Sequence, residues 1–270
     1  MPALLAALIL GIVEGITEFL PVSSTGHLVV VEHLLDFKDV KDLFTVVIQV
    51  GAIAAVVWFY RVDLWHKIAG LLRWDAEAVH FWKLLIIATI PAGIAGLLLN
   101  SALDSLSKPS VIAATLIVGG IILWLVDRKP APRRDEPVEF RQISVKRALL
   151  IGLGQCFAIV PGVSRSGATI VSGLLTGLNR PTATAFSFYL SIPVLVLASG
   201  LTLFKDHDKI GQLPGGAGAL VIGLVASFIT ALIAVSWLLR YIAHHNFRPF
   251  AYYRIGAGVV IILLLAASVL

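Results

Sequence analysis

Hydrophobic residues fill this chain in long continuous runs, which is the pattern of helices that cross a lipid bilayer. A spanning helix needs about 20 predominantly apolar residues, with a working range of about 17–25. Six runs reach that length with few charges inside them. We therefore predict six transmembrane helices, at Phe44–Tyr60, Leu84–Asn100, Ser110–Val126, Thr184–Phe204, Ala217–Leu239 and Phe250–Val269.

Two further apolar regions, Pro2–Leu35 and Val145–Leu178, are interrupted by polar centres that contain Gly and Pro. The arms of the second region, before Pro161 and after Ser166, hold about 15 and 13 residues. At about 1.5 Å per residue each arm spans roughly 20 Å, which is short of the hydrocarbon thickness of about 30 Å. The arm after Thr25 is equally short, whereas the arm before Pro21 is long enough to be ambiguous. Both regions are predicted to be re-entrant helical hairpins, because broken backbone persists at membrane depth only where protein or a wet cavity surrounds it.

The two broken regions also resemble each other. The segment "LILGIVEGITEFLPVSSTGH" aligns with "LLIGLGQCFAIVPGVSRSGA" at a constant offset of 141, while Pro21 and Pro161 miss by one place. The alignment pairs Gly11 with Gly152, Val22 with Val163, Ser23 with Ser164 and Gly26 with Gly167. Each half then holds one hairpin and three spans, and because three is odd the second half is inverted. The predicted fold is one all-α polytopic membrane domain, with repeat 1 at about 1–127, a basic linker at about 128–144 and repeat 2 at about 145–270.

Composition supports this architecture and gives it an orientation. The chain is 58% hydrophobic and 14% charged, against about 25% charged in soluble domains, and its mean hydropathy is +0.93. Fourteen Lys and Arg residues fall near 61–83, 127–147, 180 and 240–248, and five fall in the other loops. The first side is predicted to be cytoplasmic by the positive-inside rule, so both termini and the mouth of the first hairpin face outward. The same rule accounts for the net charge of +5 without a nucleic-acid partner.

Two further features narrow the picture. We expect the N-terminal apolar run to be retained, because no Lys or Arg precedes it and no small-residue cleavage site clearly ends it. The single cysteine, Cys156, excludes an internal disulfide. The oligomeric state is not determined by the sequence, and a homodimer stays open.

Three charged residues, Glu14, Glu18 and Arg165, lie well inside apolar context. An ionised side chain at the centre of an inserted helix costs about 2.5–3.5 kcal/mol on insertion scales, so such residues are functional candidates. Glu14 and Glu18 are four residues apart and share one helix face. They repel each other unless one is protonated or a cation bridges them, and carboxylate oxygens suit Mg²⁺ or Ca²⁺. A structural ion pair with Arg165, or a proton relay, remains the alternative.

The polar centres supply the other groups needed for phosphate chemistry. Ser23, Ser24 and Thr25 can cap the helix after Pro21, and a helix N-terminus at membrane depth also binds anions. His27 suits general acid or base work. In "PGVSRSGAT", the guanidinium of Arg165 matches phosphate oxygens, while Ser164 or Ser166 can cap the following helix. Acids, hydroxyls, an imidazole and a guanidinium together indicate phosphoryl transfer, in which catalysis is mostly positioning and charge neutralisation.

The segments "GIVEGITEFLPVSSTGH" and "PGVSRSGAT" resemble the two signature motifs of the undecaprenyl-diphosphate phosphatase family, also called the bacitracin-resistance protein family, and the similarity covers essentially the whole chain. The resemblance implies hydrolysis of a C55 isoprenyl diphosphate to its monophosphate, which recycles the lipid carrier for peptidoglycan, and a need for a divalent cation. It also implies an outward-opening site in the bacterial cell membrane. By the resemblance, Glu14 and Glu18 match the acidic pair of the family, and Ser24, His27 and Arg165 match its essential serine, histidine and arginine. Its phosphate-contacting hydroxyls are matched by Ser23, Ser164, Ser166 and Thr169. We also expect Thr25, which is next to Ser24, to bind phosphate.

Two other functions are alternatives to hydrolysis. A polyprenyl-phosphate flippase or ion-coupled transporter would use the same inverted repeat, but the combined Ser, His, Glu and Arg set exceeds what anion binding requires. An intramembrane serine protease is disfavoured because Ser24 and His27 are only three residues apart and the chain has no G-x-S-x-G elbow. For the phosphatase, either Ser24 attacks as a nucleophile or it orients the phosphate while water attacks.

Overall fold

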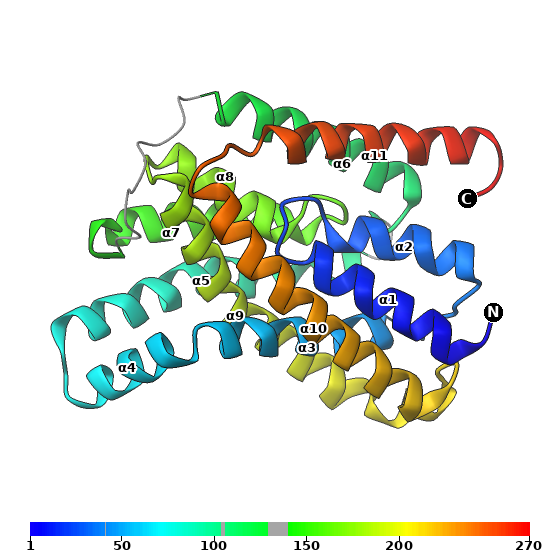
Figure 1. Cartoon of the computed structure of the whole chain (residues 1–270), viewed down its shortest axis with the longest axis horizontal. Helices are drawn as coiled ribbons and strands as arrows, with labels where there is room; N and C mark the ends of the chain where they lie inside the picture. The colour runs from blue at the N-terminus through cyan, green and yellow to red at the C-terminus, as the bar shows by residue number, and fades with distance from the viewer. Residues whose placement is uncertain (41, 104–105, 129–139) are drawn as a thin grey trace.

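In the computed structural model, which describes residues 1–40, 42–103, 106–128 and 140–270, all regular secondary structure is helical. Most of the predicted linker lies outside the described residues. The helices are α1 (Ala3–Thr17), α2 (Ser24–Leu35), α3 (Leu43–Phe59), α4 (Arg61–Leu72), α5 (Ala76–Leu103), α6 (Pro109–Val126), α7 (Val145–Gln155), α8 (Arg165–Leu175), α9 (Arg180–Asp206), α10 (Gly216–Ile242) and α11 (Arg248–Ala266), with 3-10 turns η2 (Phe140–Gln142), η3 (Cys156–Ile159) and η4 (His207–Gln212). In Figure 1 the long helices α6 and α11 lie side by side along the top, and α10 runs obliquely beside the shorter helix α1.

Five of these helices are long and apolar enough to cross a membrane: α5, α6, α9 with η4, α10 and α11. A sixth span follows if α3 and α4, which meet at an angle of 75°, are counted as one broken span. All six predicted segments lie within or largely within these helices, so an all-α protein with multiple candidate spans is confirmed. The segment 61–83, expected to be a loop, instead forms α4 and the start of α5. Leu64, Ile68 and Leu71 recur in α4 at helical spacing, and Leu64 is buried.

The two interrupted regions fold as pairs of short helices, α1 with α2 and α7 with α8. Each second helix begins directly after a serine with positive φ, 73° at Ser23 and 72° at Ser164. Ser23 Oγ accepts a hydrogen bond from Gly26 N at 3.4 Å, and Ser164 Oγ accepts one from Gly167 N at 3.0 Å. Among the predicted cap candidates, Ser23 and Ser164 are therefore the N-caps, and Ser24 and Ser166 form other hydrogen bonds. Non-glycine residues with positive φ cost about 1–3 kcal/mol and gather at functional sites, so the matching strain marks both breaks.

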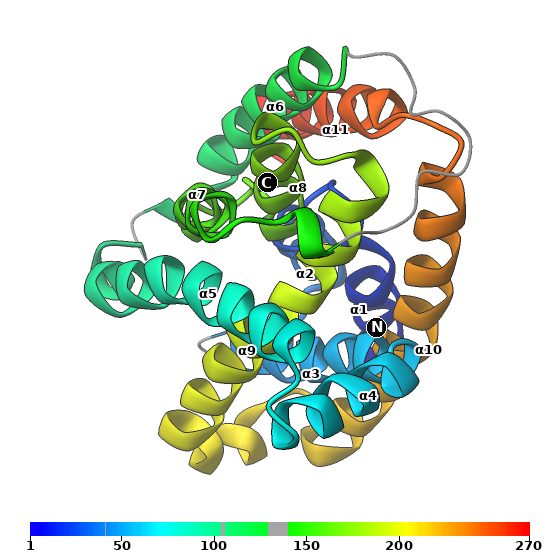
Figure 2. The same ribbon diagram turned by 90° about the vertical axis from the view of Figure 1, so that its left-hand side faces the viewer.

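Helices from the two halves of the chain interleave. α1 packs along α10, α7 packs along α5, and α6 packs along α11. Figure 2 shows α6 beside α11 and α1 beside α10. The backbones approach closely at glycines: a Cβ at Gly11 would lie 2.3 Å from Gly223 O, and one at Gly152 would lie 2.5 Å from Ala88 O. The first helix of each half is therefore held against the other half.

This packing brings the two helix breaks together inside the molecule. Phe19 and Val22, from the α1–α2 break, belong to one buried cluster with Ile170 of α8 and Phe188 of α9. The rings of Phe19 and Phe188 meet edge to face, with centroids 5.3 Å apart. Both chain termini lie at the right-hand end of Figure 1, whereas α4 and α7 lie toward its left-hand end. The breaks thus occupy the interior between the two ends.

Candidate active site

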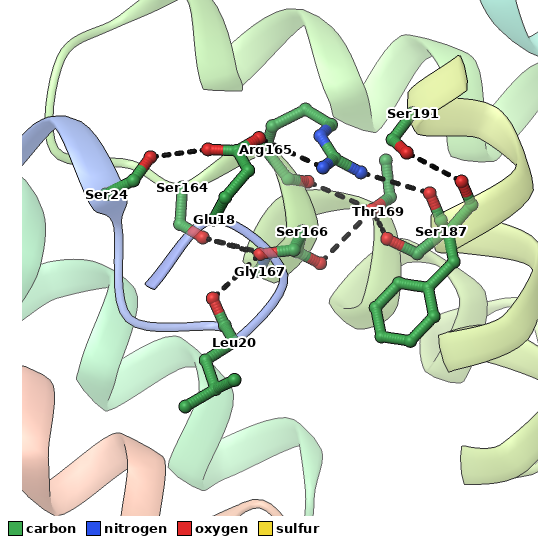
Figure 3. A network of polar contacts seen from close by, with 11 residues as sticks. Glu18, Leu20, Ser24, Ser164, Arg165, Ser166, Gly167, Thr169, Ser187 and Ser191 are labelled. Carbon is green, nitrogen blue, oxygen red and sulfur yellow. Dashed lines mark hydrogen bonds and ion pairs between the residues drawn. The ribbon is translucent and has the colours of Figure 1, made fainter. Parts of the chain in front are cut away.

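Glu18, Ser24 and Arg165 form a connected polar group at the meeting point of the breaks (Figure 3). Ser24 Oγ donates a hydrogen bond to Glu18 Oε2 at 2.5 Å. Arg165 Nη2 donates to Glu18 Oε1 at 3.1 Å, which forms an ion pair between residues 147 positions apart in sequence. Glu18 and Ser24 are 6% and 7% exposed, so water screens these contacts little. One carboxylate therefore joins a hydroxyl from its own hairpin to the guanidinium of the other.

The guanidinium of Arg165 is held in place by contacts on both Nη atoms, whereas its Nε is unpaired within the described residues. Its Nη1 donates to Ser187 O at 3.0 Å, and its Cζ lies 5.6 Å from the centroid of the Phe19 ring. Its Nε is buried, and within the described residues it has no hydrogen-bond partner. A fixed guanidinium with an unpaired donor is suited to binding an anionic oxygen.

The hydroxyls of Ser166 and Thr169 tie the second hairpin to its surroundings. Ser166 Oγ donates to Leu20 O at 2.9 Å and lies 3.1 Å from Ser164 Oγ (Figure 3). Thr169 Oγ1 lies 2.6 Å from Ser187 Oγ. Ser166 and Thr169 are 0% and 1% exposed and do not line the cavity described below. Ser166 and Thr169 therefore hold α8 against its neighbours, and the phosphate contact predicted for them stays a prediction.

His27 lies one helical turn into α2 and is engaged on both ring nitrogens. Nδ1 lies 2.7 Å from Ser23 O, and Nε2 lies 2.7 Å from the hydroxyl of Tyr253 on α11. The two rings stack at an interplanar angle of 4°. The hydrogen-bond partner of Ser24 is therefore Glu18, and His27 is instead connected to Tyr253.

Glu14 lies one turn before Glu18, and its helical spacing is confirmed by the hydrogen bond from Glu18 N to Glu14 O at 2.9 Å. Its side chain is fully buried, and both carboxylate oxygens lack a hydrogen-bond partner within the described residues. Buried carboxylates nearly always have partners, so this one is an unusual feature of the fold. Among the described residues, no three His, Cys, Asp or Glu side chains gather closely enough to hold a metal ion by themselves.

A cavity of about 250 Å³ opens beside Ser24. Its polar lining includes Glu18, Ser23, Ser24, Ser164 and Arg165, together with Thr25, Gln49 and Gln155; its apolar lining includes Ala92, Ala158, Ile159, Val160, Val194 and Leu195. The volume is below the roughly 300–1,000 Å³ of pockets that enclose a drug-sized ligand. A polar headgroup with the first part of an apolar tail fits this lining better than a whole lipid.

Comparison with known proteins assigns a family to this arrangement. Residues 7–260 match the family described as bacitracin resistance protein BacA. The chain belongs to this family. It is similar to the undecaprenyl-diphosphatase of Nitrosospira multiformis, with 48% identity over 96% of this chain and 94% of that protein. A protein of the same name in Deinococcus radiodurans is 45% identical over 98% of this chain and 97% of its own length. Another in Bordetella pertussis is 42% identical over 96% of this chain and 95% of its own length.

In this BacA-family chain, sequence reasoning missed Arg254, which is 1% exposed on α11 and touches both helix breaks. Arg254 lies near the start of a predicted span, where charges are ordinary, so the sequence alone does not single it out. The glycine pair Gly119–Gly120 on α6 was an available signal, since a Cβ at Gly119 would lie 2.2 Å from Arg254 Nη2. Arg254 donates hydrogen bonds to five backbone carbonyls, of Pro21 at 3.3 Å, Thr115 at 3.3 Å, Leu116 at 3.5 Å, Gly162 at 3.1 Å and Val163 at 2.9 Å.

Proposed function

We propose that this protein hydrolyses undecaprenyl diphosphate to undecaprenyl phosphate and inorganic phosphate, within a bacterial cell membrane. The observation that carries the proposal is the Ser24–Glu18–Arg165 connection, which places a hydroxyl, a carboxylate and a guanidinium at one buried cavity. The name undecaprenyl-diphosphatase carried by relatives over nearly their full length supports the substrate.

The first half of the reaction follows from the contacts of Ser24. Ser24 Oγ attacks the terminal phosphorus while Glu18, which already accepts its hydrogen bond, takes the proton. The bond between that phosphorus and the bridging oxygen breaks, and its electron pair leaves with undecaprenyl phosphate. Arg165, with its unpaired Nε, neutralises the charge that develops on the phosphate oxygens.

The second half returns the site to its starting state. Water attacks the phosphorus of the phosphoserine, the bond to Ser24 Oγ breaks, and Glu18 returns its proton to Ser24. The proton of the water leaves with the inorganic phosphate. His27 would move protons during this half-reaction, as an imidazole whose ring nitrogens contact Ser23 O and the Tyr253 hydroxyl. The N–H groups at the start of α2 and α8 add positive potential.

Glu14 is a residue that would hold a divalent cation, together with Glu18 in the states of the reaction in which Glu18 is ionised. The unpartnered buried carboxylate of Glu14 fits such an ion. Mg²⁺ is commonly held by one or two carboxylates with substrate phosphates and water, whereas Ca²⁺ takes six to eight oxygen ligands. Two carboxylates therefore favour Mg²⁺, which would add positive charge at the phosphate.

We further propose that α1–α2 and α7–α8 are re-entrant hairpins of an inverted repeat. The matching serine caps, the glycine contacts of α1 and α7, and the interleaved helix pairs support this arrangement. The end with the two termini would face outward, because α4, the start of α7 and the connection between α10 and α11, which carry several Lys and Arg residues, lie toward the other end (Figure 1).

Phosphate release by purified protein in detergent tests the function. Wild type is expected to release phosphate from undecaprenyl diphosphate, while Ser24→Ala and Arg165→Ala lose at least about a hundredfold in turnover. Near-wild-type turnover in either variant would remove that residue from the mechanism. Detergent micelles offer no membrane to cross, so a flippase or transporter alone would release no phosphate. Acid quenching with labelled substrate should leave label on wild type and none on Ser24→Ala.

A further inference from the structure

Gln155, the last residue of α7, has a buried side chain to which the proposed reaction gives no role. It is 2% exposed and lines the same cavity as Ser24, Glu18 and Arg165. Neither Nε2 nor Oε1 has a hydrogen-bond partner within the part of the chain that the structure describes. A carboxamide offers two donors and an acceptor, and such groups are rarely left unpaired in a protein interior. Since both ends are unpaired, either orientation of the amide leaves a donor for a ligand.

The charges around the cavity explain why a neutral donor is useful there. Of the lining residues, Glu18 and Arg165 are the ones that carry formal charge, and they pair with each other at 3.1 Å. A diphosphate brings several negative charges to a lining that is close to neutral overall. Hydrogen bonds from uncharged donors to charged oxygens are stronger than those to neutral oxygens. Gln155 can supply such a bond without repelling the phosphate.

The repeat shows that this position differs in charge between the two halves. At the offset of 141 residues, Gln155 corresponds to Glu14, just as Arg165 corresponds to Ser24. Both Gln155 and Glu14 are buried, and neither side chain has a hydrogen-bond partner among the described residues. A carboxylate therefore occupies this position in the hairpin that carries Glu18, and an isosteric amide occupies it in the hairpin that carries the guanidinium.

We propose that Gln155 is a substrate-binding residue that donates a carboxamide N–H to a phosphate oxygen of the bound diphosphate. This inference rests on the proposed function, because it assigns a contact in the same site. The apolar lining residues next to Gln155 in sequence, Ala158 to Val160, would then face the first part of the lipid tail.

Gln155→Met, with a side chain of similar length and no hydrogen-bonding amide, tests the contact. Turnover of undecaprenyl diphosphate is measured with purified full-length protein in detergent, alongside thermal unfolding with and without inorganic diphosphate. We expect kcat/KM to fall about 10–100-fold, mainly through KM, with an unfolding temperature equal to or above that of wild type. We also expect the stabilisation by inorganic diphosphate to shrink. Gln155→Glu should lose more than Gln155→Met, because its carboxylate repels the phosphate.

Ser227→Ala is the matched control, because Ser227 on α10 is also buried and unpartnered within the described residues but does not line the cavity. Its kinetics should equal those of wild type. If Gln155→Met keeps kcat/KM and diphosphate stabilisation within twofold of an active wild type, or loses activity only because it unfolds more easily, the inference is overturned. If wild type releases no phosphate but Gln155→Met loses diphosphate stabilisation, the proposed function fails and the contact stands. A wild type that neither reacts nor is stabilised overturns both.

Discussion

At the scale of single residues, Glu18 is the point through which the two halves of the chain meet. It accepts hydrogen bonds from Ser24 and Arg165, and its burial makes both contacts strong. The charges of Glu14, Glu18 and Arg165 stand out in apolar sequence, so these residues were predictable. Gln155 and Tyr253 were not, because neutral polar residues near helix ends are common and only the fold shows what they face.

Removing the hydroxyl of Tyr253 tests the connection of His27 at the same scale. Tyr253→Phe deletes the partner of His27 Nε2 while it keeps the stacked ring. A neutral hydrogen bond contributes about 0.5–1.5 kcal/mol, so we expect kcat/KM to fall about 2–10-fold. Steady-state kinetics of Tyr253→Phe, His27→Gln and the double variant measure it. The double variant should be no slower than His27→Gln, and a further loss would show that Tyr253 acts independently of His27.

At the scale of elements, α11 holds the two breaks in place through Arg254. Its guanidinium reaches carbonyls of both breaks, where the chain leaves helical geometry, and it also reaches carbonyls in the middle of α6. The helix breaks themselves followed from Pro, Gly and the serine caps, which act locally. The contacts of Arg254 that hold one break against the other could not be predicted from these local signals, because Arg254 lies about 90 positions beyond the second break.

Arg254→Met should therefore damage stability and turnover together. Each buried carbonyl of the two breaks that is left unpaired costs about 1–3 kcal/mol, although the losses of neighbouring groups do not add fully. We expect a fall of several kcal/mol in unfolding free energy, and only partial rescue by Arg254→Lys, whose compact ammonium cannot span five carbonyls. Unfolding in detergent and phosphate release measure both effects. Arg240→Met, at an exposed arginine of α10, is the control, and equal stability in the two variants would contradict this role of Arg254.

At the scale of the whole molecule, hydrophobic run length was enough to locate the candidate spans, because bilayer thickness fixes the length of a spanning helix. The α3–α4 bend was not predictable in this way, since the helical pattern continues through Tyr60. The proposed orientation depends on loop charge, a property of the chain in its membrane rather than of its packing.

Single-cysteine labelling of cells tests that orientation. The two test variants, Lys38→Cys and Arg73→Cys, are made in a Cys156→Ser background. Lys38 is an exposed residue of the α2–α3 connection, and Arg73 is an exposed residue directly after α4. We expect a membrane-impermeant maleimide to label Lys38→Cys in intact cells and Arg73→Cys only after permeabilisation. The reverse pattern would invert the proposed topology.

In the proposed function, residues from both hairpins act as one catalytic centre. A double-mutant cycle of Glu18→Gln and Arg165→Gln measures this most directly, through kcat/KM for phosphate release from undecaprenyl diphosphate by proteins shown to be folded. Residues that act as a unit are strongly non-additive. We expect each single variant to lose at least about a hundredfold in kcat/KM and the double variant to be about as slow as the slower single variant. Losses that multiply in the double variant would contradict a single centre.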